Sequence, residues 1–146
     1  MKGYCDSSFL TSLYMPDSNA SSAVSQFESA GAPLGITELC RVEFTNALQL
    51  RIFRNQMTPA QARGASLALD DDVAGGLLTL HAFPAAAWEE ARRISLAHTP
   101  TIGARSLDIL QIAAALTLGA PVFLTFDRVQ RKLAAAVGLH VSLGRH

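Results

Sequence analysis

The sequence predicts one α/β domain, built on a central, mostly parallel sheet of about five strands flanked by helices. Three observations support this prediction. Short apolar segments alternate with longer segments of helical character, as in βαβ units. The chain has 146 residues, a length typical of one domain, and 49% of them are hydrophobic. No internal repeat, linker or low-complexity stretch divides the chain, so we expect a single domain over residues 1–146.

The predicted strands are the short apolar segments, which are bounded by glycine, proline or the start of a helix. The first is Lys2–Cys5, and the clearest is the run that begins at Val122 and ends at Thr125. In chain order, the expected strands cover residues 2–5, 34–36, 77–83, 122–125 and 139–143.

Capping and stop signals predict where the helices begin and end. Thr58-Pro59-Ala60-Gln61 combines an N-cap hydroxyl, a proline in the first turn and a glutamine at the third position. Ser7 and Ser8 can cap the first helix, and Pro16-Asp17 stops it. Pro84 opens a helix that we expect to end at His98, before a loop. The expected helices cover residues 7–14, 19–30, 37–55, 58–73, 84–98, 106–119 and 127–137.

Composition restricts the possible functions. Lysine plus arginine number 12, as do aspartate plus glutamate, so any binding of nucleic acid must come from a local patch. No apolar run approaches the ~20 residues that span a bilayer, and the amino terminus lacks the apolar region of a secretory signal. Cys5 and Cys40 form no Cys-x-x-Cys pair, so we expect buried free thiols. The sequence thus predicts a soluble, cytoplasmic protein with no membrane partner.

Four acidic residues lie next to apolar segments, where an unpaired carboxylate is costly. Asp6 and Asp127 each end a predicted strand, and Asp108 opens an apolar helix. Ligands of parallel sheets bind beyond the carboxyl ends of the strands, so these three acids can meet at one edge. Each could instead cap a helix, and Asp127-Arg128-Val129-Gln130 resembles a capping box.

The fourth acid, Glu43, lies within a long predicted helix. It follows Leu39 by four residues and precedes Ala47 by four, which places it on or beside the apolar stripe. A purely structural role would require a cation such as Arg41 or Arg51 to reach it.

Charge repulsion among these acids favours a bound cation. Two carboxylates ~4 Å apart repel by roughly 4 kcal/mol at an effective dielectric of 20. Magnesium or manganese would compensate, because both prefer oxygen ligands. Zinc is less favoured, because the four histidines show no paired spacing. The run Asp70-Asp71-Asp72 is not a candidate, because consecutive helical residues point ~100° apart and cannot converge on one ion.

Together these residues resemble the PIN-domain nucleases, in particular the VapC-type toxin ribonucleases of type II toxin–antitoxin systems. Four segments carry the resemblance, in the order found in that family and over most of the chain: Tyr4–Leu10, Thr37–Phe44, Arg105–Ala113 and Phe123–Asp127. The third segment is the most specific of the four.

The resemblance implies a three-layer PIN-like fold with an acidic pocket for Mg²⁺ or Mn²⁺. It makes Asp6, Glu43, Asp108 and Asp127 the catalytic residues and metal ligands, directly or through water. The supporting hydroxyls would be those of Ser7 or Ser8, Ser106 and Thr125, although the serines could be caps and Thr125 an ordinary strand residue. Asp127 itself could be a ligand or mainly a cap.

The resemblance also implies partners and an activity. The substrate would be RNA, cut by a metal-activated water, and the protein partners would be a cognate antitoxin and a second copy of the chain. Phosphate contacts could come from five arginines, each of which could equally be a solvated surface residue: Arg41, Arg51, Arg54, Arg105 and Arg128. Apolar residues of the first and third helices could serve protein contacts or belong to the core.

Other function classes fit less well. A phosphoacceptor receiver would need paired acids after the first strand, and an aspartate-nucleophile phosphatase would need an aspartate where Ser8 stands. The strongest rival is a catalytically inactive PIN-like domain that serves as a binding or scaffold partner. The presence of all four acids argues against it.

Overall fold

The computed structural model describes residues 1–142. Four strands form one parallel sheet in the order β3-β2-β1-β4. Their bounds are Gly3–Cys5 for β1, Leu34–Thr37 for β2, Leu78–His81 for β3 and Phe123–Leu124 for β4. The predicted α/β fold with a parallel sheet flanked by helices is therefore confirmed, with four strands in place of about five.

The fifth predicted strand, residues 139–143, is reduced to a single bridge. Val141 pairs in parallel with Phe123, whose N–H donates to the carbonyl oxygen of His140 and whose carbonyl accepts from the N–H of Ser142. Because β4 is itself two residues long, it offers little edge along which pairing could continue. Leu143, the end of the predicted strand, lies outside the described residues.

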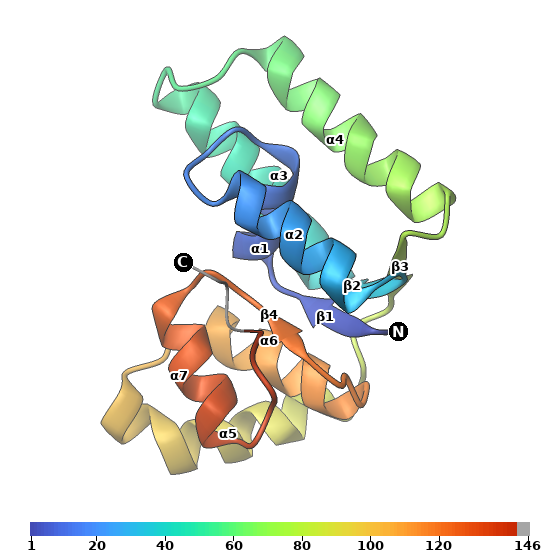
Figure 1. Ribbon diagram of the computed structural model, residues 1–146. Helices are drawn as coiled ribbons and strands as arrows, with labels where there is room; N and C mark the ends of the chain where they lie inside the picture. Colours follow the sequence, from blue (N-terminus) through green and yellow to red (C-terminus); the bar gives the residue numbers. More distant parts are fainter. Residues whose placement is uncertain (143–146) are drawn as a thin grey trace.

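Helices cover the sheet in two groups (Figure 1). On one side lie α1 (Ser7–Tyr14), α2 (Ala20–Ala30), α3 (Glu38–Phe53) and α4 (Pro59–Ala74). On the other side lie α5 (Ala87–Ile102), α6 (Ser106–Thr117) and α7 (Arg128–Ala136). Within residues 1–142, no helix is both long enough and apolar enough to cross a lipid bilayer.

The core fills the space on both sides of the sheet. All residues of β1, β2 and β4 are buried, as expected for parallel strands covered on both faces. Two stacked aromatic pairs lie in this core: the ring of Tyr4 in β1 stacks on Phe123 in the neighbouring β4, and the ring of Phe9 in α1 stacks on Phe126, in the segment that follows β4. Cys5 and Cys40 are buried free thiols, as predicted.

The predicted end of the α5 helix was wrong. Residues 99–102, expected to belong to a loop, form its last turn. Pro100 lies two residues before the end of this helix, so the donor that it lacks interrupts the hydrogen bonding of the last turn only. The helix ends at Gly103, whose positive φ of 71° suits glycine and whose N–H donates to the carbonyl of Thr99 at 2.8 Å. Pro84 does not start the helix as predicted but lies in a turn before it, where its carbonyl oxygen accepts from the N–H of Ala87.

Two helix starts show how local sequence sets the caps. At α4, Thr58 accepts from the N–H of Gln61 and the side chain of Gln61 accepts from the N–H of Thr58, which confirms the predicted capping box. At α1, the cap is Asp6 and not Ser7 or Ser8, because Asp6 Oδ1 accepts from the N–H of Phe9 at 2.9 Å.

Candidate metal centre

The four acidic residues come from four different elements. Asp6 follows β1, and Asp127 follows the segment that leaves β4 and is the N-cap of α7. Asp108 lies in the first turn of α6, and Glu43 lies in the second turn of α3. The strand order explains the meeting of Asp6 and Asp127, because β1 and β4 are parallel neighbours whose carboxyl ends lie at one edge.

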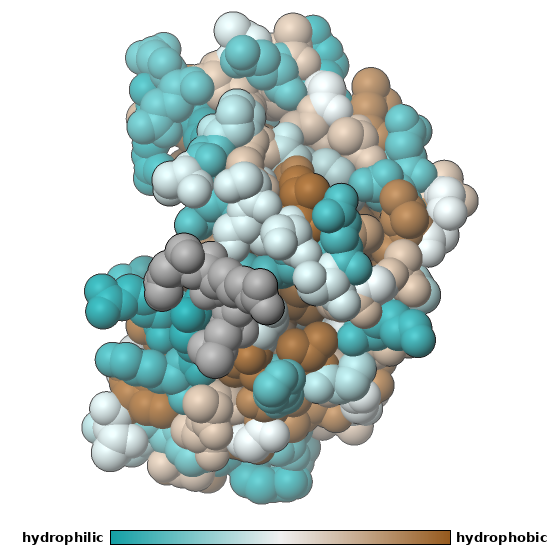
Figure 2. All heavy atoms as spheres, in the orientation of Figure 1, coloured by the Kyte–Doolittle hydropathy of each residue, from teal (hydrophilic) through white to brown (hydrophobic). Residues whose placement is uncertain are grey.

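A pocket of about 370 Å³ lies at this edge and is lined by three of the acids, Glu43, Asp108 and Asp127. Figure 2 shows the surface hollowed at its left margin, between the two groups of helices and on the side where α1 and α7 begin. The other lining residues are mostly polar: Ser7, Ser8, Thr11, Ser12, Asp17, Asn19, Ala47, Arg51, Phe126 and Gln130. Larger hollows, one along α5 and one on the outer side of α3, lie elsewhere and contain none of the four acids.

Asp6 lies behind the pocket and is fully buried. Its Oδ2 accepts a hydrogen bond from the hydroxyl of Thr125, and its Oδ1 accepts from the hydroxyl of Ser8 at 2.7 Å. Burial, with a smaller contribution from the charge of Asp127, raises the pKa of Asp6 to about 7, although the hydrogen bonds from Thr125, Phe9 and Ser8 oppose the rise. Three donors on a buried carboxylate indicate a site built to hold that group in one orientation.

Thr125 and Ser8 connect Asp6 to Asp127. Thr125 Oγ1 accepts from the N–H of Asp127 at 2.9 Å while it donates to Asp6. Ser8 Oγ lies 3.2 Å from Thr125 Oγ1 and accepts from the N–H of Phe126. The two hydroxyls therefore bind the carboxyl end of β4 to the start of α1.

Glu43 faces the pocket from α3 without a cation. Its carboxylate accepts from the hydroxyl of Ser7 at 3.3 Å and from the amide of Gln111. Burial raises the pKa of Glu43, these two hydrogen bonds oppose that rise, and the charges of Asp108 and Asp127 add to it. Glu43, Asp108 and Asp127 therefore lie close enough for their charges to repel.

Asp108 and Asp127 each use one oxygen to stabilise a helix start. Asp108 Oδ2 accepts from the N–H of Arg105 at 3.1 Å, and Asp127 Oδ1 accepts from the N–H of Gln130 at 2.8 Å. Gln130 also donates to Asp108 Oδ1, over a longer 3.4 Å. Asp127 Oδ2 has no hydrogen-bond partner within residues 1–142, so a capping role leaves one oxygen available to the pocket.

No arginine neutralises these acids within the described part of the chain. Arg41 pairs with Asp70 at 2.9 Å, so it does not serve Glu43. Arg51 is the one basic residue that lines the pocket, and it lies 4.0 Å from Asp17. The cation that a purely structural role of Glu43 would require is thus not found among residues 1–142.

The donor set suits a hard cation held largely through water. In the arrangement of residues 1–142, no three His, Cys, Asp or Glu side chains are close enough to hold one metal ion together. Magnesium commonly keeps several waters and uses one or two carboxylates, which the acids that line this pocket supply. Glu43, Asp108 and Asp127 would face the ion from the pocket, and Asp6 would approach it from behind.

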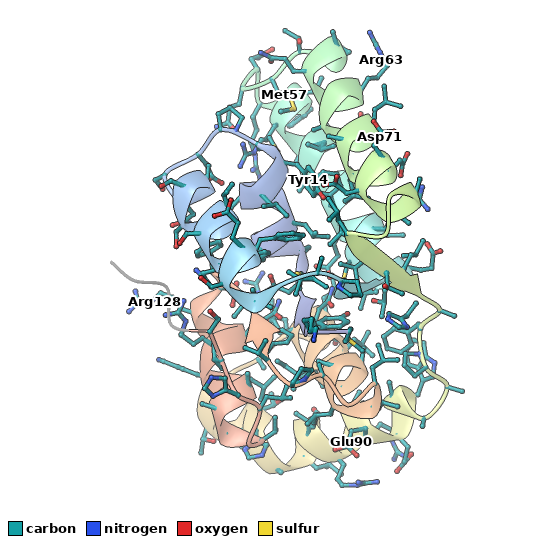
Figure 3. All side chains as sticks on the ribbon, turned by 45° about the vertical axis from the view of Figure 1, so that its right-hand side comes forward. Tyr14, Met57, Arg63, Asp71, Glu90 and Arg128 are labelled. Atoms are coloured by element: carbon teal, nitrogen blue, oxygen red, sulfur yellow. The ribbon has the colours of Figure 1, made fainter. Side chains whose placement is uncertain are left out.

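In the acidic run on α4, Asp70 and Asp71 are exposed, whereas Asp72 is half-buried. Asp70 is exposed and pairs with Arg41, and Asp72 accepts from the hydroxyl of Tyr14. Figure 3 shows Asp71 on the outer side of α4, while Tyr14 lies toward the neighbouring helices.

Among the supporting hydroxyls, Ser7 and Thr125 contact Glu43 and Asp6 respectively. Ser106 is exposed at the first residue of α6 and makes no hydrogen bond to the four acids within residues 1–142, so its role stays a prediction.

Sequence reasoning missed Gln111 and Gln130. The signal for Gln111 was present, since it is the one uncharged polar residue in the otherwise apolar run Ile109–Leu116.

Comparison with known proteins identifies the family of the chain and solved structures with a similar fold. A family model described as PIN domain matches residues 3–136. No curated protein sequence matches the chain. VapC20 from Mycobacterium tuberculosis, a sarcin-ricin loop cleaving toxin, is similar over 93% of this chain and 95% of its own, with 17% identity and a TM-score of 0.70. FitAcB from Neisseria gonorrhoeae is similar over 98% of each chain, with 15% identity and a TM-score of 0.64. At these identities the likeness is one of fold.

Proposed function

The chain belongs to the PIN domain family, and from this premise we propose that it is a metal-dependent endoribonuclease and the toxin of a toxin–antitoxin pair. In this proposal residues 1–146 form one catalytic PIN domain that acts in the cytoplasm on RNA. The observation that carries it is the pocket that Glu43, Asp108 and Asp127 line without an arginine partner among residues 1–142, with Asp6 buried behind them.

The proposed cofactor is Mg²⁺ or Mn²⁺, which when bound lowers the pKa of a water and offsets the charge of the phosphate. The four acids would hold it, directly or through water. Thr125 and Ser8 orient Asp6, and Ser7 orients Glu43. An ionised Asp6 is costly in its buried place, and a nearby cation would remove that cost.

Substrate binding would use the polar rim of the same pocket. Arg51 is half-buried there, and its 4.0 Å separation from Asp17 is too long for a strong ion pair, so its guanidinium is available to a phosphate. Arg128, exposed at the start of α7, projects away from the body of the molecule and could reach a more distant phosphate (Figure 3). RNA, rather than DNA, is proposed from the family resemblance.

The proposed protein partners are a cognate antitoxin and a second copy of the chain. Two large apolar residues on α3 support protein contacts, since Val42 is 65% exposed and Phe53 is 83% exposed. Among the apolar residues of the first and third helices that could serve protein contacts or belong to the core, Leu10 and Leu48 belong to the core.

The test is RNA cleavage by purified protein with and without a chelator. We expect cleavage in Mg²⁺ or Mn²⁺, none in excess EDTA, and none for Asp6→Asn or Asp108→Asn variants that keep the folded circular dichroism spectrum. Cleavage that persists in EDTA would reject the metal-dependent mechanism. A folded protein that binds RNA but never cuts it, with either metal, would identify the inactive scaffold alternative.

A further inference from the structure

A buried polar network connects the first strand to the floor of the pocket. The hydroxyl of Tyr4 donates to Oε1 of Gln111 at 2.6 Å, and the thiol of Cys40 lies within donating distance of the same oxygen, at 3.1 Å, and of the carbonyl oxygen of Cys5, at 3.3 Å. Tyr4, Cys40 and Gln111 are all fully buried. The ring of Tyr4 is held in turn by stacking on Phe123.

This network determines which way the Gln111 amide faces. Because Oε1 accepts from Tyr4 and Cys40, the NH₂ group points the other way and donates to Oε1 of Glu43 at 2.5 Å. The flipped amide would place its oxygen against the carboxylate of Glu43, and two acceptors there would repel. The amide orientation follows from its partners on both sides.

Glu43 depends on this amide more than on its other contact. The second hydrogen bond, from Ser7, is longer at 3.3 Å, and no cation pairs with Glu43 within residues 1–142. Without a firm donor, a half-buried glutamate with three side-chain torsions would sample several orientations at a cost in binding precision.

We propose that Gln111 is a positioning residue, locked by Tyr4 and Cys40, which holds the Glu43 carboxylate in the orientation that binds a divalent cation. The inference rests on the proposed function, because it assigns Gln111 a role at the same pocket. Outer hydrogen-bond partners of metal ligands typically change metal affinity by roughly 10- to 100-fold, and this is the size of effect expected here.

The test measures Mn²⁺ affinity by calorimetry on the RNA-free protein. Gln111→Met keeps an unbranched side chain of similar volume but removes both hydrogen-bonding groups, and we expect it to weaken Mn²⁺ binding by about 10-fold or more. Tyr4→Phe keeps the ring and removes the hydroxyl, and we expect a smaller loss in the same direction. The matched control is Gln26→Met, a buried glutamine on α2 bonded to Ser22, which should leave Mn²⁺ affinity unchanged.

A double-mutant cycle separates positioning from a merely structural role. If Gln111 acts through Glu43, then Gln111→Met should weaken Mn²⁺ binding no further in a Glu43→Gln background. Losses that add in full would overturn the proposal, as would a folded Gln111→Met or Tyr4→Phe protein with the parent affinity. If Gln111→Met does not fold, Tyr4→Phe decides alone. A parent protein that binds no Mn²⁺ rejects the proposed function as well, whereas a parent that binds it while the variants match it rejects this inference only.

Discussion

The hydroxyl of Thr125, just beyond the end of β4, donates a hydrogen bond to the carboxylate of Asp6. Asp6 follows β1 and precedes Thr125 by 119 residues in the chain. The same oxygen of Thr125 accepts from the N–H of Asp127. One small side chain therefore sets the relative position of two acids that the proposed reaction requires, at the edge where two neighbouring parallel strands end.

Removing this hydroxyl should reduce activity without unfolding the protein. Thr125→Val has nearly the same shape but leaves Asp6 with one donor fewer and the N–H of Asp127 without its partner. We expect RNA cleavage to fall by roughly 10- to 100-fold, the usual effect of losing a partner that orients a metal ligand. Thr125→Ser, which keeps the hydroxyl, is the matched control and should retain most of the activity. A folded valine variant that cuts RNA at the parent rate would contradict the role given to Thr125.

The raised pKa of Asp6 predicts that stability depends on pH. Its pKa moves from 3.8 to about 7 on folding, so the folded state favours the protonated acid. The resulting stabilisation is complete below pH ~4 and is lost as pH rises through about 7. The side chain of the Asp6→Asn variant cannot ionise. In EDTA, its free energy of unfolding should therefore equal that of the parent near pH 4 and exceed it at pH 8 by up to about 4 kcal/mol. Urea unfolding of both proteins at each pH measures the difference, and equal stabilities at pH 8 would mean that Asp6 is not a strained buried acid.

Metal binding should stabilise the folded protein mainly above neutral pH. At pH 8 the parent carries an ionised Asp6, so Mn²⁺ should raise its melting temperature, with a gain near 2.7 kcal/mol at 100 times the dissociation constant. At pH 5 the proton competes with the ion, and the shift should be much smaller. Differential scanning calorimetry at the two pH values checks this, with Asp6→Asn as the variant that should show little shift at either. An equal metal-induced shift at pH 5 and pH 8 would argue against binding at Asp6.

Arg51 should contribute to RNA affinity more than Arg54, the residue at which the same helix ends. Arg51 lines the pocket, whereas Arg54 is exposed outside it. In an Asp108→Asn background that cannot cut, we expect Arg51→Ala to weaken binding of a labelled single-stranded RNA about 3- to 10-fold. The slope of log affinity against log salt should fall by about 1, as for the loss of one phosphate contact. Arg54→Ala is the control, and equal losses in the two variants would mean that only general charge matters. Fluorescence anisotropy at several salt concentrations measures both quantities.

Much of the fold could be predicted because its signals are local. The capping box at Thr58 and the strand predicted over Val122–Thr125 each depend on neighbouring residues; the capping box formed as predicted, and the strand formed at the predicted place but only over Phe123–Leu124. The same holds for the places of Asp6 and Asp127 after strands. The extent of α5 could not be predicted, because the cost of Pro100 depends on how few helix hydrogen bonds follow it. The fifth strand was reduced to one bridge because its partner β4 is so short, which no local pattern reveals.

The sequence by itself determined the chemistry that is present: four carboxylates next to apolar segments, without a basic residue beside most of them. Only the tertiary structure decided which of these side chains lie next to one another. It placed β1 next to β4, brought Glu43 to the same pocket as Asp108, and aimed the Gln111 amide at Glu43 through donors from Tyr4 and Cys40. The physical reason is the distance along the chain over which each interaction acts. Caps and periodicity act over a few residues of chain, whereas the pairing of strands and buried hydrogen bonds joins residues up to 119 positions apart, and packing of the whole core selects them.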